Sequence, residues 1–288
     1  MIFKGTATAL ITPFTKDGID FEGFDRLLDD QVASGIDAVV ILGTTGEPAT
    51  MSLDEKKAVI AFTVKKLKGK LPIIVGAGSN STATAIDMCH IAEEMGADAL
   101  LVVTPYYNKC TQGGLIAHYT AIAKSTKLPI ICYNVPGRTG VNILPATFAE
   151  IAKIENIAAI KEASGNMEQI EECLRLCRGN AVVYSGDDGL TIPILAMGGV
   201  GVISVVSNVI PKFTADMTDE FFRGDLETAR NMQLQMLPFV KAIFSEVNPI
   251  PVKYAAKLKG FCNGLLRLPL TELTEPNAKV LTDLLKQF

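Results

Sequence analysis

The sequence Ile157-Ala-Ala-Ile-Lys161-Glu-Ala-Ser164-Gly165 is typical of a short buried strand that ends in polar residues. Because strand side chains alternate, Lys161 shares a face with Ala159, whereas Glu162 points to the other face. Burial disfavours the charged ammonium and frees the amine lone pair, so Lys161 is a candidate nucleophile. The alternative from this stretch alone is a lysine that reaches the surface or pairs with a carboxylate.

Strand-like and helix-like segments alternate along the chain around this stretch. The expected strands are Gly5–Leu10, Ala38–Leu42, Ile73–Gly76, Ala99–Thr104, Ile130–Asn134, Ile157–Glu162, Ala181–Ser185 and Val202–Val206. The expected helices between and after them are Phe21–Ser34, Leu53–Lys68, Thr82–Met95, Leu115–Ser125, Pro145–Ile154, Met167–Arg178 and Pro211–Arg223. Helix starts are indicated by Ser52 with Glu55 three residues later and by Pro145. About eight apolar strands that alternate with helices favour an α/β fold with a parallel sheet, most simply a closed barrel.

A faint internal repeat also favours side-by-side β/α units. Gly35-Ile-Asp-Ala-Val-Val recurs at Gly96, and Leu71-Pro-Ile-Ile recurs at Leu128, each about two units later. The alternative is that both patterns are ordinary turn chemistry between a helix and a strand. Beyond the last strand, residues 225–288 contain further helical segments, so we expect a barrel over residues 1–224 and a helical region over residues 225–288 packed on it.

Composition excludes several classes of function. The 288 residues are 48% hydrophobic and carry a net charge of −4, and the basic residues are dispersed, which argues against a nucleic-acid or anionic-membrane surface. We see no bilayer-spanning segment and no signal-peptide pattern, and expect a cytoplasmic protein. The six cysteines do not suggest a disulfide framework. Cys173 and Cys177 fit one helix face better than a zinc site, because neither His90 nor His118 forms a local ligand pair, so no metal is expected.

Unusually polar or glycine-rich segments follow five of the apolar strands. In a β/α barrel the loops after the strands carry the chemistry, so five such ends together indicate a site. They are Gly43-Thr44-Thr45-Gly46-Glu47, Pro105-Tyr106-Tyr107-Asn108, Tyr133-Asn-Val-Pro-Gly-Arg138-Thr-Gly140, Lys161 itself and Ser185-Gly186-Asp187-Asp188.

Each of these ends has a physical use. The Gly43–Gly46 turn can aim backbone N–H groups and two hydroxyls at a carboxylate. Tyr133, on the strand beside Lys161, suits proton transfer, and the planar fork of Arg138 suits a second carboxylate. Singly, each feature could be a simple turn, a core tyrosine or a surface charge. No dinucleotide fingerprint or phosphate loop is present, and Gly198-Gly-Val-Gly201 precedes a strand, so we expect a turn there and a site without a cofactor.

Together, the motifs Gly43–Glu47, Tyr133–Gly140 and Lys161–Gly165 resemble the dihydrodipicolinate synthase family across essentially the whole chain. This family belongs to the pyruvate-dependent class I aldolases, which include N-acetylneuraminate lyase. The resemblance implies a (β/α)8 TIM barrel with a C-terminal helical extension, assembled as a homotetramer of tight dimers. It also implies condensation of pyruvate with L-aspartate 4-semialdehyde to 4-hydroxy-tetrahydrodipicolinate, in the diaminopimelate route to lysine. No cofactor is implied, because pyruvate itself forms the imine.

The resemblance also implies a role for each site residue. Lys161 would form the Schiff base, and Tyr133 and Thr44 would take part in a proton relay. Tyr107 would complete the relay from the neighbouring subunit. The remaining positions would bind substrates: Thr45 would hold the pyruvate carboxylate with Thr44, Arg138 would receive the semialdehyde carboxylate, and Gly186 and Ile203 would line the pocket through backbone groups.

Two other functions remain open at this stage. One is a sibling aldolase acting on a sugar keto acid or sialic acid, although Arg138 suits a short charged aldehyde better. The other is a barrel that binds keto acids without catalysis, against which Lys161, Tyr133 and Thr44 argue.

Feedback by lysine is expected to be weak or absent. Lysine-inhibited members of the family carry histidines after the GTTGE loop and a glutamate on the helix after the third strand, where this chain has Leu53, Lys56 and Thr84. Losing a carboxylate and gaining a cation weakens the binding of a cationic amino acid. Asn80 and Tyr106 keep the family's residues and would mark only a weak allosteric region.

Overall fold

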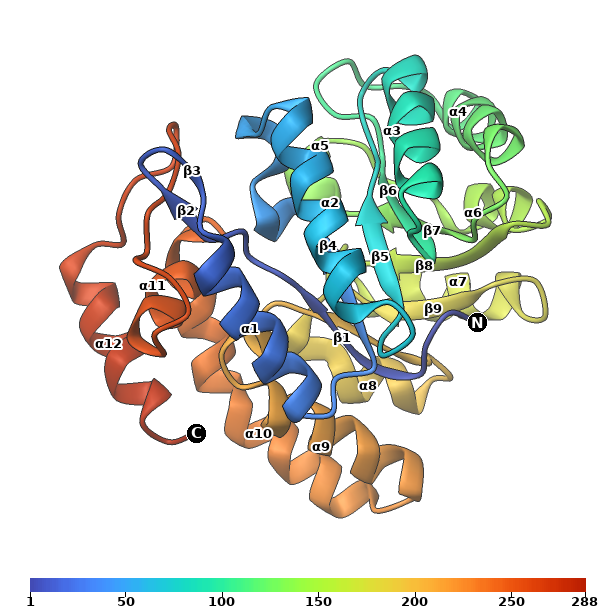
Figure 1. Ribbon diagram of the computed structural model, residues 1–288. Helices are drawn as coiled ribbons and strands as arrows, with labels where there is room; N and C mark the ends of the chain where they lie inside the picture. Colours follow the sequence, from blue (N-terminus) through green and yellow to red (C-terminus); the bar gives the residue numbers. More distant parts are fainter.

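The computed structural model describes residues 1–288 and contains a closed barrel of eight parallel strands (Figure 1). The barrel strands are β1 (Gly5–Ala9), β4 (Ala38–Ile41), β5 (Ile73–Gly76), β6 (Ala99–Val103), β7 (Ile130–Asn134), β8 (Ile157–Glu162), β9 (Val182–Ser185) and β10 (Gly201–Ser204). Strand β1 pairs with both β4 and β10, which closes the sheet. The predicted (β/α)8 TIM barrel is therefore confirmed. A two-stranded sheet of β2 (Phe14–Thr15) and β3 (Gly18–Ile19) lies outside it.

Helices surround the barrel, and three more follow it. They are α1 (Phe21–Ala33), α2 (Leu53–Leu67), α3 (Thr82–Glu94), α4 (Gln112–Ser125), α5 (Pro136–Thr139), α6 (Pro145–Ile151), α7 (Met167–Cys177), α8 (Thr191–Ala196), α9 (Pro211–Arg223), α10 (Leu226–Ile243), α11 (Ile250–Leu258) and α12 (Glu275–Leu285). The predicted capping box is present, since Ser52 and Glu55 exchange hydrogen bonds at the start of α2. Figure 1 shows α10, α11 and α12 grouped at one side of the barrel. None of the helices has the length and apolar character needed to cross a bilayer.

Three local predictions were wrong. The short helix α8 was missed, because it follows a 3₁₀ turn and spans only six residues. Arg138 lies on the one-turn helix α5, started by Pro136, and not on an open loop. Gly201 was expected in the turn before the last strand, but strand β10 begins at this residue. A Cβ there would come within 2.3 Å of the Gly5 carbonyl oxygen, so this position needs glycine.

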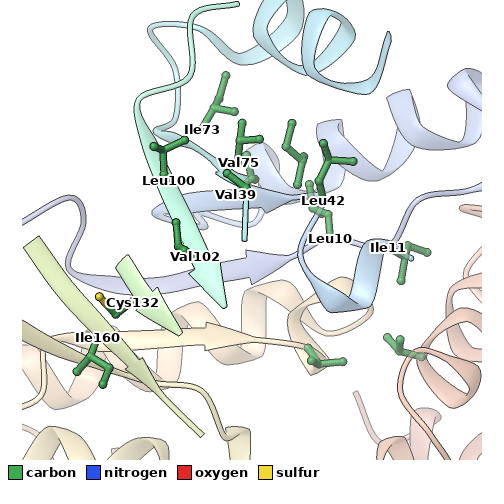
Figure 2. Packing of buried hydrophobic residues seen from close by; sticks show 14 of the residues in the cluster. Leu10, Ile11, Val39, Leu42, Ile73, Val75, Leu100, Val102, Cys132 and Ile160 are labelled. Atoms are coloured by element: carbon green, nitrogen blue, oxygen red, sulfur yellow. The ribbon is translucent and has the colours of Figure 1, made fainter. Parts of the chain in front are cut away.

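Two layers of apolar side chains make up the core, one inside the barrel and one between the strands and the helices. The inner layer consists of residues such as Ala38, Val40, Ile74, Leu101, Ile131, Ala159, Tyr184 and Ile203. The outer layer uses the intervening positions, and Figure 2 labels Val39, Ile73, Val75, Leu100, Val102, Cys132 and Ile160 among them. This period-two alternation explains why the strands read as continuous apolar runs. Cys173 and Cys177 are buried on α7, as predicted, and all six cysteines are free.

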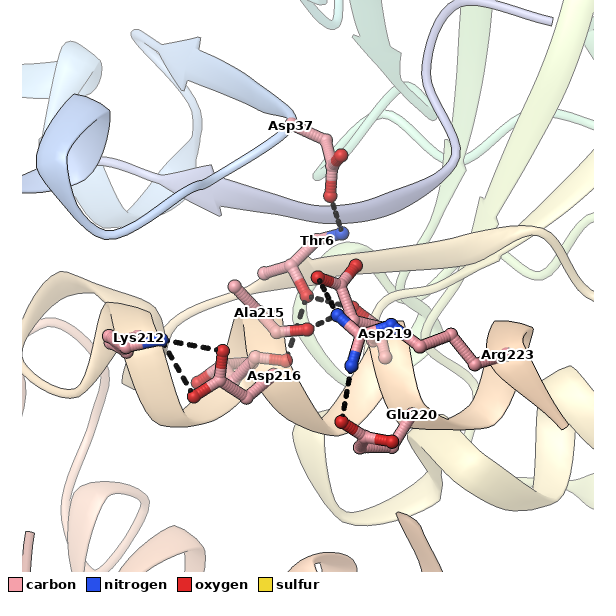
Figure 3. Close-up of polar contacts among 10 residues, drawn as sticks. Thr6, Asp37, Lys212, Ala215, Asp216, Asp219, Glu220 and Arg223 are labelled. Carbon is pink, nitrogen blue, oxygen red and sulfur yellow. Dashed lines mark hydrogen bonds and ion pairs between the residues drawn. The ribbon is translucent and has the colours of Figure 1, made fainter. Parts of the chain in front are cut away.

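Buried polar contacts at β1 help to close the barrel (Figure 3). The Thr6 amide donates to Asp37 Oδ2 at 2.7 Å, and the Thr6 hydroxyl donates to the Thr214 carbonyl oxygen of α9 at 3.1 Å. Burial raises the pKa of the Asp37 carboxyl, and the bond from Thr6 opposes that rise. The first strand is thereby tied both to the loop before β4 and to the last barrel helix.

Candidate active site

Lys161 and Tyr133 lie side by side at the carboxyl ends of β8 and β7. The two residues are register partners in the parallel pair, and the Lys161 ammonium nitrogen lies 4.3 Å from the centroid of the Tyr133 ring. Lys161 is only 5% exposed, so the alternative of a lysine that reaches bulk solvent is wrong. Strand parity places it on the same face as Ala159, inside the barrel, as predicted.

Gly186, directly after strand β9, lies close to the Lys161 side chain. A Cβ at position 186 would lie 2.7 Å from the Ala163 Cβ and 3.1 Å from the Lys161 Cε. The Gly186 amide donates to the Glu162 carbonyl oxygen at 2.7 Å, which fixes this close approach. Ile203, on β10, is buried in the inner core layer. The glycine therefore leaves the room that the lysine side chain occupies.

The predicted anion-binding turn is present after β4. Thr44–Gly46 form a 3₁₀ turn in which the amides of Gly46 and Glu47 bond to the carbonyls of Gly43 and Thr44. The amides of Thr44 and Thr45 have no acceptor within the protein. Two N–H groups and two hydroxyls at the start of a turn suit a carboxylate.

A cavity of about 480 Å³ lies beside β7 and the Thr44–Gly46 turn, and Lys161 is not among its lining residues. Among its lining residues are Thr44, Tyr133, Arg138 and Asn248. Arg138 is exposed, and its Nη2 donates to the Asn248 carbonyl oxygen at 3.0 Å. Asn248 Nδ2 in turn donates to the Thr45 hydroxyl at 2.9 Å. Arg138 thus lines the same cavity as Tyr133 and Thr44, as its predicted role requires.

A carboxylate network behind the sheet holds the ends of β7 and β8 together. Glu162 is 1% exposed and accepts from Asn134 Nδ2 at 3.0 Å and from the Ser164 amide at 2.8 Å. Gln169 of α7 adds a third donor at 3.3 Å. As predicted, Glu162 points away from the barrel interior that holds Lys161. Its hydrogen bonds keep Tyr133 and Lys161 adjacent.

Tyr107 stands apart from the other predicted residues. It is 93% exposed, has a left-handed φ of 71° and does not line the cavity. Tyr106 does line the cavity. Asn80 does not, and its carbonyl oxygen accepts a hydrogen bond from Asn108 Nδ2 at 2.9 Å. Within one chain, Tyr107 is thus exposed, whereas Lys161 and Tyr133 are both buried.

The sequence reasoning missed Asn248 as a site residue. This asparagine lines the cavity and contacts both Thr45 and Arg138, yet it lies in the C-terminal region. Its only signal in the sequence is the Asn248-Pro-Ile-Pro251 segment, which interrupts the helical pattern of residues 225–288. Nothing local in such a break indicates a contact 203 residues away.

Known proteins similar to this chain agree along its full length. Residues 2–288 match the Dihydrodipicolinate synthetase family. A protein of Geobacter sulfurreducens named 4-hydroxy-tetrahydrodipicolinate synthase is 50% identical over 287 residues, covering 100% of this chain and 99% of that protein. A protein of the same name from Thermoanaerobacter pseudethanolicus is 48% identical over 288 residues, with 100% and 97% covered.

The fold of the chain is also closely similar to that of a solved structure. The crystal structure of dihydrodipicolinate synthase from Thermotoga maritima superposes with a TM-score of 0.98 at 45% identity, covering 100% of this chain and 99% of that one. Sequence and fold thus agree over the barrel and the C-terminal helices alike. The chain belongs to the Dihydrodipicolinate synthetase family.

Proposed function

We propose that the protein is a lyase that condenses pyruvate with L-aspartate 4-semialdehyde to 4-hydroxy-tetrahydrodipicolinate, in the diaminopimelate route to lysine. The full-length relatives carry the name of this activity. The observation that carries the proposal is the enclosed Lys161 amine, 4.3 Å from the Tyr133 ring at the barrel mouth. The sugar-directed alternative loses support, because the similar proteins bear the synthase name.

In the proposed first step, the Lys161 amine attacks the keto carbon of pyruvate and water leaves, giving an imine. The unbonded Thr44 and Thr45 amides and their hydroxyls hold the pyruvate carboxylate meanwhile. The protonated imine is an electron sink, so the pyruvate methyl group loses a proton and an enamine forms. Tyr133 carries protons between these species, with Thr44 in the relay.

The enamine then attacks the aldehyde carbon of the semialdehyde, a carbon–carbon bond forms, and the aldehyde oxygen takes a proton and becomes the 4-hydroxyl group. The amino group of the former semialdehyde then attacks the imine carbon and displaces the Lys161 amine, which closes the ring and releases the product. Arg138 receives the semialdehyde carboxylate at the cavity entrance, where a planar guanidinium can bind both oxygens. Gly186, which closely approaches the Lys161 Cε, and Ile203 would border the imine through their backbone groups. No separate cofactor is required, because pyruvate supplies the imine carbon and Lys161 the nitrogen.

We further propose how the chain is organised and assembled. Residues 1–224 act as the catalytic barrel and residues 225–288 as a helical region packed on it, a division supported by the end of α9 at Arg223. The enzyme works in the cytoplasm as a homotetramer of dimers. Tyr107 enters the neighbouring subunit's relay, a role that its 93% exposure supports.

A pair of assays tests the reaction directly. With pyruvate present, we expect turnover with aspartate 4-semialdehyde and none with N-acetylmannosamine. Turnover with the sugar alone would identify a sialic-acid aldolase. Absence of turnover with both aldehydes, together with measurable pyruvate binding, would identify a keto-acid binder.

A further inference from the structure

The Thr44–Thr45 turn is bounded by two residues with unfavourable backbone geometry. Leu42 and Glu47 have left-handed φ values of 56° and 55°, and Tyr107 is the third and last such non-glycine residue in the chain. Side chains with a Cβ rarely adopt this conformation, which persists only where the surroundings determine it. Something must therefore hold Glu47 in place.

The Glu47 side chain is held by the C-terminal region. Its carboxylate is 2% exposed, and Oε1 lies 2.5 Å from the ammonium of Lys253 on α11. Oε2 accepts from the Arg267 amide at 3.2 Å. Both oxygens of a residue directly after the turn are thus bound by residues more than 200 positions later in the chain.

Lys253 is bound just as completely. Its side chain is fully buried, and the ammonium donates to the Leu265 carbonyl oxygen at 2.8 Å in addition to Glu47. The ammonium also lies 3.9 Å from the centroid of the Phe14 ring. Burial lowers the pKa of Lys253, and the carboxylate of Glu47 opposes that change.

A buried ion pair is a weak way to stabilise a fold, because desolvation of both charges offsets their attraction. It does fix geometry, since each charge accepts only a narrow range of positions. Resting on the function proposed above, we propose that Glu47 and Lys253 are positioning residues. Their ion pair holds the Thr44–Thr45 turn in the geometry that receives the pyruvate carboxylate.

The test compares wild type with two variants. Lys253→Met leaves the Glu47 carboxylate buried without its cation, whereas the double variant Glu47→Gln with Lys253→Met removes both charges. We expect the double variant to regain most of any thermal stability that Lys253→Met loses. We expect both to keep a KM for pyruvate raised by about tenfold or more, because small misplacements of binding groups are costly. The KM for the semialdehyde should rise less than the KM for pyruvate, since Arg138 contacts the turn only through Asn248.

Lys66→Met is the matched control. Lys66 joins α2 to the exposed Asp29 carboxylate of α1 in an ion pair at 2.8 Å, outside the cavity lining, so its loss should leave the pyruvate KM unchanged. A wild-type pyruvate KM in the double variant would overturn the positioning role, as would equal rises in both substrate KM values. Failure of the wild type to form a reducible adduct with pyruvate would contradict the proposed function and the positioning role with it.

Discussion

Lys161 is enclosed by three residues that come from three different strands or strand ends. Tyr133 stacks beside its ammonium, Gly186 faces its Cε, and Ala159 lies below it on the same strand face. The amine is thus confined beside Tyr133, which lines the cavity. This confinement leaves little space for a larger neighbour.

Gly186→Ala is predicted to impair catalysis more than folding. The new methyl group would lie within 3.1 Å of the Lys161 Cε, so the lysine must shift. We expect kcat/KM to fall about 10- to 100-fold, because reactive groups tolerate only small displacements. Stability should fall by about 1–3 kcal/mol from overpacking. Steady-state kinetics and urea unfolding measure the two effects.

Gly113→Ala is the control for this substitution. Gly113 lies within helix α4, where the atom closest to an added methyl group would be the Thr111 hydroxyl oxygen, at 3.9 Å. This variant should be as active as wild type and slightly more stable, because alanine favours helices over glycine. Equal activity of Gly186→Ala and Gly113→Ala would refute the crowding argument.

At this scale, strand alternation was sufficient to predict which residues face the barrel interior. It placed Lys161 inside and Glu162 outside, and both predictions are confirmed. The partners Asn248 and Lys253 could not be predicted, because they reach the turn from 203 and 206 residues away. Local periodicity contains no information about such contacts.

At the scale of elements, the start of α2 is tied to the segment after α11. Arg267 binds both carboxylate oxygens of Glu55, with Nη1 at 2.8 Å from Oε2. This hydrogen bonding lowers the pKa of Glu55 from 4.5 to about 2. The ion pair therefore joins the start of α2 to the C-terminal region.

Glu55 is predicted to make stability depend on pH in acid. Because its folded pKa is lowered, its contribution is present above pH 4.5 and is lost as the pH falls through 4.5 toward 2. The wild type should lose about 1–2 kcal/mol more free energy of unfolding than Glu55→Gln between about pH 6 and pH 3, allowing for solvent screening. Urea unfolding at each pH measures this difference, and Arg267→Gln should behave like Glu55→Gln. Identical pH dependence in all three proteins would contradict the assignment.

The elements themselves were largely predictable, and their ends were not. All eight barrel strands were identified from apolar runs of four to six residues. The boundaries shifted by a residue or two where strands pass into turns, as at Val205–Val206, which belong to the turn after β10. The short helices α5 and α8 escaped because one or two turns carry too little periodicity to detect.

For the whole molecule, the exposure of Tyr107 predicts that active sites are shared between subunits. Lys161→Ala and Tyr107→Ala should each be nearly inactive alone. After the two proteins are unfolded together and refolded, mixed dimers contain one intact site, so activity should return to about a quarter of wild type or less. Each variant refolded alone is the control. No recovery in verified mixed dimers would show that Tyr107 does not complete a neighbouring site.

Lysine is predicted to be a poor inhibitor of the assembled enzyme. Lys56 lines the same cavity as Tyr106, so a cation already occupies this region, and Thr84 offers no carboxylate. We expect initial rates to be unaffected by lysine at concentrations of about 1 mM. Introducing Thr84→Glu together with Lys56→His should increase sensitivity. Half-inhibition of the wild type at low millimolar lysine would refute the prediction.

The central claim is that the amine of Lys161 bonds covalently to pyruvate, and one measurement tests it most directly. The protein is incubated with pyruvate and borohydride, and intact and peptide masses are then determined. We predict one reduced pyruvate adduct per chain, located on the peptide that contains Lys161 and absent from Lys161→Ala. An unmodified chain, or an adduct on another lysine, would contradict the account.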